Sequence, residues 1–304
     1  MRCFVSRGLP GLALERLARV HEVSVWPRPL PPEPGQLRAE AAAADGLLCL
    51  LSDRIDAALL DAAPRLRVIA NYAVGWDNID LQATAARGIP VGVTPDVLTD
   101  ATADIAMALL LAIARRLPQA AADVRAGRWR TWEPSGWLGL ELAQATLAIV
   151  GAGRIGRATG RRAEGFGMNV VYVRRGDDLH AALAGADVVS LHVPLSQDTR
   201  HLIDAAALRA MKPTALLVNT ARGGLVDQSA LRHALAEGWI AGAGLDVTDP
   251  EPPAREDPLL GAPNLLVLPH IGSATRWARE RMAERTVENL LAGLAGEPLP
   301  TPAG

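Results

Sequence analysis

The sequence predicts an α/β fold built on parallel β-sheet. Short apolar runs alternate with helix-like stretches along almost the whole chain, a pattern typical of parallel strands joined by crossover helices. A buried strand at 147–150 runs directly into a glycine-rich turn and a helix, which favours the same class. The chain has 304 residues, enough for one large domain or two of ordinary size.

The first 95 residues form one series of strands and helices. Residues 46–51 are a continuous apolar run, which predicts a buried strand. The strand predicted at 22–26 ends at the proline-rich stretch 27–34. Strands are predicted at 2–6, 22–26, 46–51, 67–71 and 90–93, and helices at 11–20, 35–44 and 79–87.

A long helix rich in alanine and leucine is predicted next, at 97–117. Thr99 suits its start, and Arg116 and Pro118 suit its end. The Gly, Pro and Trp content of 127–140 indicates a loop. The second series has predicted strands at 146–150, 169–173, 188–193, 215–219, 241–247 and 265–268, helices at 157–166 and 179–184, and a last helix at 274–293.

The charge balance argues against some classes of partner. The chain carries 31 basic and 33 acidic side chains, a net charge of −2, so binding of nucleic acid or an anionic membrane by bulk charge is not expected. Lys212 is the only lysine, and the other basic side chains are arginines. Codon bias explains most of these arginines. Cys3 and Cys49 lie in apolar runs and are interpreted as buried hydrophobes in a reduced compartment, with no metal site. No signal segment or long apolar run is seen, so a cytoplasmic protein is expected.

The glycine-rich turn at 151–156 is the first functional motif. Gly151 permits a tight turn, Gly153 lets backbone amides approach a pyrophosphate, and Gly156 allows close packing of helix on strand. A lone GxGxxG is weak evidence, but this one lies between a buried strand and a helix, with another strand beyond it. The motif therefore predicts a dinucleotide site.

The residues after the second strand of this unit bear on the choice of cofactor. NAD enzymes usually place an acidic residue there, but this strand ends in Arg174 and Arg175, which suit a 2′-phosphate. Asp177 and Asp178 come late for a ribose contact. NADP(H) is therefore favoured, with NAD(H) as the alternative if the arginines are simply solvated at a turn.

Three polar residues follow three strands of the second series. Arg222 follows the strand at 215–219, Glu251 the strand at 241–247, and His270 the last strand. Because the carboxyl ends of parallel strands share one edge of a sheet, these side chains are expected to converge near the glycine-rich turn. Taken singly, Arg222 would be interpreted as a surface arginine, Glu251 as a loop glutamate and His270 as a packed histidine. The three together favour a catalytic set.

On these residues the chain resembles the D-isomer-specific 2-hydroxyacid dehydrogenases over almost its whole length, and most closely their glyoxylate/hydroxypyruvate reductase branch. The matching segments are 71–80, 94–104, 151–156, 219–227, 238–252 and 269–275. The resemblance implies two doubly wound parallel-sheet domains, Rossmann-like or flavodoxin-like, with a deep inter-domain cleft. Residues 1–96 with 274–304 would form a discontinuous substrate-binding domain, and 97–273 the dinucleotide-binding domain. It also implies a homodimer built through the nucleotide domain, in which the helix at 97–117 and the tryptophan segment would embrace the other subunit.

The resemblance also implies a role for each catalytic residue. Arg222 would bind the substrate carboxylate and polarise its 2-oxo group, and His270 would protonate the carbonyl oxygen as hydride reaches C2. Glu251 would pair with His270 and orient it. Backbone amides at Val74 and Gly75 would hold the carboxylate. The net reaction would be reduction of glyoxylate to glycolate or of hydroxypyruvate to D-glycerate.

Cofactor and pocket residues follow in the same way. Asp246 would receive the nicotinamide carboxamide, and Trp137 would help to cap the substrate pocket, with an interface or core aromatic as the alternative. The expected cofactor contacts are Thr102, Gly151, Ala152, Gly153, Arg154, Ile155, Gly156, Arg174, Arg175, Pro194, Thr220, Ala221, Asp246 and Gly272.

One departure from the family is visible. Only 12 residues separate Arg175 from the strand at 188–193, where the family fits a helix, a short strand and a second helix. There is room for one helix, so the edge strand beyond 169–173 is predicted to be absent. The adenosine-phosphate pocket would then be more open on that side.

Other functions on the same fold remain as alternatives. Relatives of the D-lactate, D-3-phosphoglycerate and phosphite type differ in substrate, and some relatives are dinucleotide-sensing corepressors that bind partner peptides. Glu251 disfavours the formate dehydrogenase type, which has glutamine there. Arg174 and Arg175 oppose the NAD preference expected of a lactate enzyme.

Overall fold

The computed structural model describes all 304 residues as two compact units. Unit 1 comprises Met1–Leu98 and Ala274–Gly304, and unit 2 comprises Thr99–Ser273. The boundaries expected from the sequence, after residues 96 and 273, lie within two residues of these.

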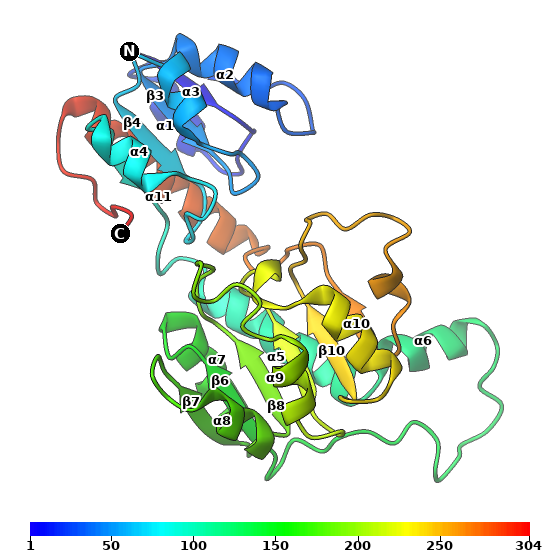
Figure 1. Cartoon of the computed structure of the whole chain (residues 1–304). Coiled ribbons are helices and arrows are strands. Elements are labelled where there is room, and N and C mark those ends of the chain that lie inside the picture. Colours follow the sequence, from blue (N-terminus) through cyan, green and yellow to red (C-terminus); the bar gives the residue numbers. More distant parts are fainter. The chain divides into compact units, whose positions relative to one another are not determined.

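Unit 1 is a five-stranded parallel sheet in the order β2-β1-β3-β4-β5, with helices on both faces (Figure 1). Helices α2, α3 and α4 cover one face, and α1 and α11 cover the other. The strands are β1 (Arg2–Val5), β2 (Glu22–Val25), β3 (Gly46–Cys49), β4 (Val68–Asn71) and β5 (Val91–Gly92), and the helices are α1 (Ala13–Ala18), α2 (Pro34–Ala42), α3 (Ala57–Ala62), α4 (Leu81–Ala86) and α11 (Arg276–Ala295).

Helix α11 returns from the end of the chain and packs on the first sheet at short range. Three glycines permit this approach. A Cβ on Gly46 of β3 would lie 3.0 Å from Leu290, one on Gly92 of β5 would lie 2.5 Å from Asn289, and one on Gly293 of α11 would lie 2.4 Å from Val68. Side chains at these positions would push the helix away from the sheet.

Unit 2 is a six-stranded parallel sheet in the order β11-β10-β9-β8-β6-β7. Helices α5 and α7 cover one face, and α8, α9 and α10 cover the other. The strands are β6 (Thr146–Val150), β7 (Asn169–Val173), β8 (Val188–Leu191), β9 (Leu216–Asn219), β10 (Gly242–Leu245) and β11 (Leu265–Val267), and the helices are α5 (Thr99–Ala114), α6 (Leu117–Arg125), α7 (Arg154–Gly165), α8 (Leu179–Gly185), α9 (Ala205–Ala210) and α10 (Gln228–Ala236).

The sheet of unit 2 ends at β7, so the predicted absence of an edge strand is confirmed. Between β7 and β8 the chain forms only α8. Val171 in β7 is exposed, consistent with an uncovered edge of the sheet.

Four helices were not anticipated from the sequence: α3, α6, α9 and α10. They are only six to nine residues long, which gives little periodicity to detect. Three of them do carry a readable start, because Asp56, Asp204 and Asp227 each accept a hydrogen bond from the backbone N–H three residues later.

The predicted end of the long helix at 97–117 is wrong. Helix α5 stops at Ala114, and Arg116 takes a left-handed backbone conformation with φ of 51° before α6 begins at Leu117. The pair is bent by 62° at this break. No single helix is long and apolar enough to span a membrane; α5 and α6 taken together meet that length and composition, and half of the residues of α5 are buried in unit 2.

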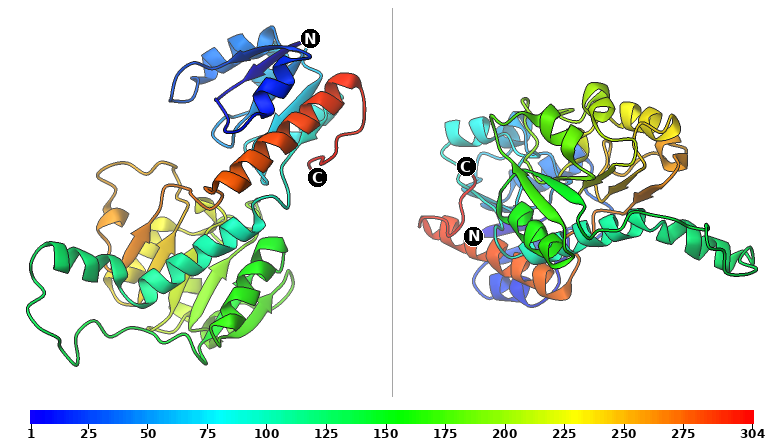
Figure 2. Two further views of the ribbon diagram at one scale, coloured as in Figure 1. Left: turned by 180° about the vertical axis from the view of Figure 1, so that it is seen from behind. Right: turned by 90° about the horizontal axis from the view of Figure 1, so that it is seen from below.

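Helix α6 and the loop after it form an arm that projects from unit 2 (Figure 2). No residue of α6 is buried. Residues 127–140 contain no helix or strand, as predicted. The large apolar side chains exposed on this arm are Leu117, Val124, Trp129, Trp132, Trp137 and Leu138.

The close approach of α11 to β4 can be tested at Gly293. We expect Gly293→Ala to lower the free energy of unfolding by about 1–3 kcal/mol, because its Cβ would overlap Val68 and force a shift in a packed core. Gly35→Ala in α2 is the matched control. No atom lies within 4 Å of its Cβ position, so it should be neutral or stabilising by less than about 1 kcal/mol. Urea unfolding of both variants makes the comparison, and equal stabilities would contradict the packing described.

Candidate active site

The glycine-rich turn joins β6 to α7 at the carboxyl edge of the second sheet. Gly151 has φ of 104°, and a Cβ there would lie 2.7 Å from the carbonyl of His192 after β8. Gly156 faces inward, where a Cβ would lie 2.1 Å from the carbonyl oxygen of Gly151. Helix α7 starts at Arg154, three residues earlier than predicted, so Arg154 and Ile155 belong to its first turn.

The surroundings of this turn fit a dinucleotide. Gly153 is exposed, and no atom lies within 4 Å of the position that its Cβ would take, so backbone amides are open to a pyrophosphate there. The twelve-residue helix α7 adds the positive end of its dipole. At the neighbouring strand end, the hydroxyl of Thr220 is buried and has no hydrogen-bond partner within the chain. It is thus available to a bound group.

Arg174 and Arg175 follow β7 on the exposed side of the same edge. A guanidinium nitrogen of Arg175 lies 2.9 Å from a carboxylate oxygen of Asp198, and the two side chains are 93% and 72% exposed. Asp177 accepts the backbone N–H of Arg174 at 2.7 Å, and Asp178 caps α8 by accepting the N–H of Ala181. Both aspartates therefore serve the local turn.

Arg222 lies in a short loop that begins where β9 ends. The buried side chain of Asn219 holds this loop, because it accepts the N–H of Ala221 at 3.0 Å and donates to the carbonyl of Arg222 at 2.8 Å. Gly223 brings the loop against the chain after β10, since a Cβ there would lie 2.0 Å from the carbonyl carbon of Thr248. The side chain of Arg222 is half-buried.

His270 is held by the buried carboxylate of Asp246, the residue that follows β10. Asp246 accepts the backbone N–H groups of Ile271 and Gly272 at 2.8 and 2.7 Å, and its own carbonyl accepts the N–H of His270 at 2.9 Å. Burial raises the pKa of Asp246, and the two amide hydrogen bonds oppose that rise. His270 takes a positive φ of 54° in this turn.

The imidazole of His270 meets Glu251. The distance from Nδ1 of His270 to Oε1 of Glu251 is 2.6 Å, and the side chains are 23% and 35% exposed. Because a carboxylate only accepts, Nδ1 donates, and Nε2 is the nitrogen left for other chemistry. The arrangement is an oriented proton donor beside an arginine loop.

The residues expected to contact the nicotinamide also gather here. A Cβ on Gly272 would lie 3.1 Å from Asp246 and 3.3 Å from Thr102 of α5. Thr102, Asp246 and Gly272 are thus mutual neighbours. Pro194 lies in the loop after β8, and its carbonyl accepts the hydroxyl of Thr199 at 2.7 Å.

Trp137 is not near these residues within its own chain. Two residues later, a Cβ on Gly139 would lie 2.1 Å from the carbonyl of Ala114, at the last turn of α5. Thr102 and Ala114 are twelve residues apart on that helix, which is about 18 Å. Trp137 therefore belongs to the opposite end of α5 from the Asp246 loop, on the projecting arm.

Val74 and Gly75 lie in unit 1, in the loop that follows β4. Both are half-buried, and neither backbone N–H has a hydrogen-bond partner within the chain. Sequence reasoning missed the side chains that hold this loop, Asn71 and Asn78, as it missed Asn219. For Asn71 and Asn219 the available signal was an asparagine as the last residue of a buried strand.

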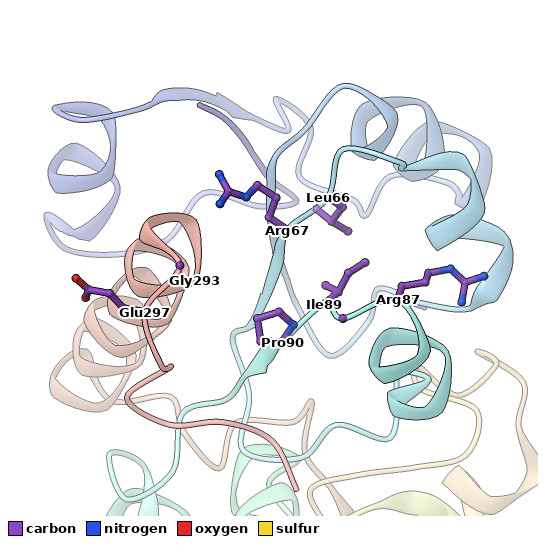
Figure 3. Close-up of a pocket in the computed structure, with 9 residues that line it drawn as sticks. Leu66, Arg67, Arg87, Ile89, Pro90, Gly293 and Glu297 are labelled. Carbon is purple, nitrogen blue, oxygen red and sulfur yellow. The ribbon is translucent and has the colours of Figure 1, made fainter.

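A surface cavity of about 410 Å³ in unit 1 is separate from all of these residues (Figure 3). Leu66, Ile89 and Pro90 line it, and the charged groups of Arg67, Arg87 and Glu297 point away from one another. It lies at the opposite ends of β4 and β5 from the 71–80 loop and offers no converging polar groups.

The fold and this edge together define an α/β protein with a dinucleotide site. The family model "D-isomer specific 2-hydroxyacid dehydrogenase, NAD binding domain" matches residues 107–272. Among its relatives, the glyoxylate reductase of Thermococcus litoralis is 46% identical over 97% of this chain and 94% of its own length. That of Thermococcus kodakarensis is 48% identical over 99% and 95%.

Solved structures agree with this. A Thermus thermophilus protein is 51% identical, with a TM-score of 0.95 over the full length of both chains. The NADPH-dependent glyoxylate/hydroxypyruvate reductase of Sinorhizobium meliloti, solved with NADP and malonate, is 36% identical, with a TM-score of 0.87 over all of this chain and 96% of that one. The chain belongs to the D-isomer-specific 2-hydroxyacid dehydrogenase family, and it is an NAD(P)-dependent oxidoreductase.

Proposed function

We propose that this protein is an NADPH-preferring reductase of small 2-oxo acids, converting glyoxylate to glycolate and hydroxypyruvate to D-glycerate. The observation that carries the proposal is the contact between His270 and Glu251 on the unit that bears the glycine-rich turn. The names of the relatives support the choice of glyoxylate. Unit 2 would hold the cofactor, and unit 1 would contribute to substrate binding.

His270 acts as the general acid in this proposal. Glu251 accepts a hydrogen bond from Nδ1–H, and Nε2–H donates its proton to the substrate's carbonyl oxygen, which becomes the hydroxyl. The bound nicotinamide supplies the hydride to C2. Glu251 fixes the orientation of the ring throughout.

Arg222 binds the carboxylate and polarises the carbonyl. Its planar fork can engage two oxygens at once, a geometry that lysine cannot reproduce. The backbone amides of Val74 and Gly75 provide further donors to the carboxylate. These contacts use only the carboxylate and the 2-oxo group, which glyoxylate and hydroxypyruvate share.

The carboxyl edge of the second sheet would hold the cofactor. Backbone amides of Gly153, Arg154 and Ile155 receive the pyrophosphate, and Ala152 lies in the same turn. The remaining contacts proposed for the cofactor come from Thr102, Pro194, Thr220, Ala221, Asp246 and Gly272.

The activity is tested by steady-state reduction of glyoxylate, hydroxypyruvate and pyruvate. We expect His270→Ala to lower kcat by about 10²- to 10⁴-fold with the dissociation constant for NADPH unchanged, because only the proton donor is lost. Glu251→Gln should also lower kcat. Glu256→Gln, an exposed acid in the same loop, is the matched control. A His270→Ala variant with the full rate would overturn the mechanism.

The cofactor preference is tested at Arg174 and Arg175. We expect the double alanine variant to raise KM for NADPH by about 10-fold or more and to leave KM for NADH unchanged, because hydrogen bonds to a charged phosphate are each worth about 1.5–3 kcal/mol. Arg161→Ala, an exposed arginine of α7, is the control. If the parent protein had a higher kcat/KM with NADH than with NADPH for every substrate, the proposed preference for NADPH would be contradicted.

A homodimer built through the arm of α6 and its loop is part of the proposal. Six large apolar side chains are exposed within residues 117–138, which is typical of a surface that another protein covers. Since Trp137 lies away from its own chain's Asp246 loop, a pocket role for it requires the second subunit.

The dimer is tested by light scattering after size-exclusion chromatography. The parent protein should have twice the chain mass of 32.0 kDa, and Trp132→Arg should shift it towards the monomer by placing a charge in the contact. Trp277→Arg, which changes another exposed tryptophan, in unit 1, should remain dimeric. A monomeric parent protein would refute the arrangement.

A further inference from the structure

We infer that Asn71 and Asn78 form a positioning pair that holds the loop at 72–76 with the carbonyl of Gly75 turned inward and the amides of Val74 and Gly75 open for the substrate carboxylate. The inference deepens the proposed function and rests on it. Both residues belong to unit 1, and Asn71, the last residue of β4, is fully buried.

The side chain of Asn71 connects the two ends of the loop. Its Nδ2 donates one hydrogen bond to the carbonyl of Gly75 at 2.9 Å and the other to Oδ1 of Asn78 at 3.1 Å. Cys49 on the adjacent strand approaches Oδ1 of Asn71 at 3.5 Å. Each proton of the Asn71 amide therefore has an acceptor, and only this orientation of the amide is satisfied.

Asn78 anchors the pair to the segment that follows β3. Its Nδ2 donates to the carbonyls of Leu50 and Asp53 at 3.0 and 2.9 Å, which lie after β3. Its own carbonyl accepts the N–H of Ile55 at 2.9 Å. The pair thus joins the ends of β3 and β4 and cannot turn without breaking several partly buried hydrogen bonds.

The backbone of the loop shows the consequence. The carbonyls of Ala73, Gly75 and Trp76 accept hydrogen bonds from within unit 1, from Thr94, Asn71 and Ile79. The N–H groups of Val74 and Gly75 have no partner within the chain. Consecutive free amides in a loop whose carbonyls at Ala73, Gly75 and Trp76 are engaged make an anion-binding concavity, and a carboxylate is the anion that the proposed substrate carries.

Two substitutions separate a positioning role from a merely structural one. Asn71→Ala removes both donors, and Asn71→Asp keeps the shape but turns an oxygen towards two acceptors. For both we expect KM for glyoxylate to rise by about 10- to 100-fold, with a smaller change in kcat and an unchanged dissociation constant for NADPH. The inhibition constant of oxamate, an unreactive analogue that carries the same carboxylate, should rise in step with KM.

Asp45→Ala is the matched control. Asp45 is buried in the same unit and accepts hydrogen bonds from the backbone of Arg2 and from Arg65, but it precedes β3 at the opposite end of the strands. It should lower the unfolding midpoint without changing KM. If Asn71→Ala unfolds, Asn78→Ser and Asn71→Asp carry the comparison.

The outcomes are distinct. A parent protein that reduces glyoxylate, with variants whose KM and oxamate inhibition match those of Asp45→Ala, would overturn the positioning pair alone. A parent protein that reduces no 2-oxo acid would overturn the proposed function, and the positioning pair with it.

Discussion

The buried carboxylate of Asp246 is the interaction on which the catalytic edge of unit 2 depends. It accepts two consecutive backbone amides after β11, and its own carbonyl takes the amide of His270. These three hydrogen bonds force a tight turn, so His270 adopts a left-handed conformation that a non-glycine residue seldom takes. The strain is offset by the satisfied carboxylate, and the ring is held where Glu251 can reach it.

The same edge shows why residues far apart in the chain act together. The carboxyl ends of parallel strands lie at one edge of the sheet, so the loops that follow them are neighbours. The N–H of Asp246 donates a hydrogen bond to the carbonyl of Asn219. Gly223 lies so close to the backbone of Thr248 that no side chain would fit between them. The arginine loop and the histidine turn are therefore parts of one hydrogen-bonded edge. A shift in one loop is transmitted to the others through backbone contacts.

The strands of both sheets, the absent edge strand and the convergence of Glu251 with His270 could be predicted from sequence, because apolar runs and strand-end residues carry this information locally. The short helices α9 and α10 were missed because they have too few turns to show a period. Trp137 is expected at the pocket from the resemblance, but Gly139 packs against Ala114 and places it at the far end of α5, a tertiary contact that local sequence does not reveal. The Asn71–Asn78 pair depends on amide orientations, which only three-dimensional contacts determine.

The lost edge strand leaves cofactor selection to a few exposed groups. Asp177 and Asp178 each accept a backbone hydrogen bond, in the turn after β7 and at the start of α8, so one oxygen of each carboxylate is engaged locally. Arg175 meets Asp198 in an ion pair that is almost wholly exposed, and such pairs contribute less than about 1 kcal/mol. A phosphate dianion forms stronger, charge-assisted hydrogen bonds with a guanidinium than this. Replacing Asp198 by a 2′-phosphate therefore costs little, so this ion pair is compatible with a preference for the phosphorylated cofactor.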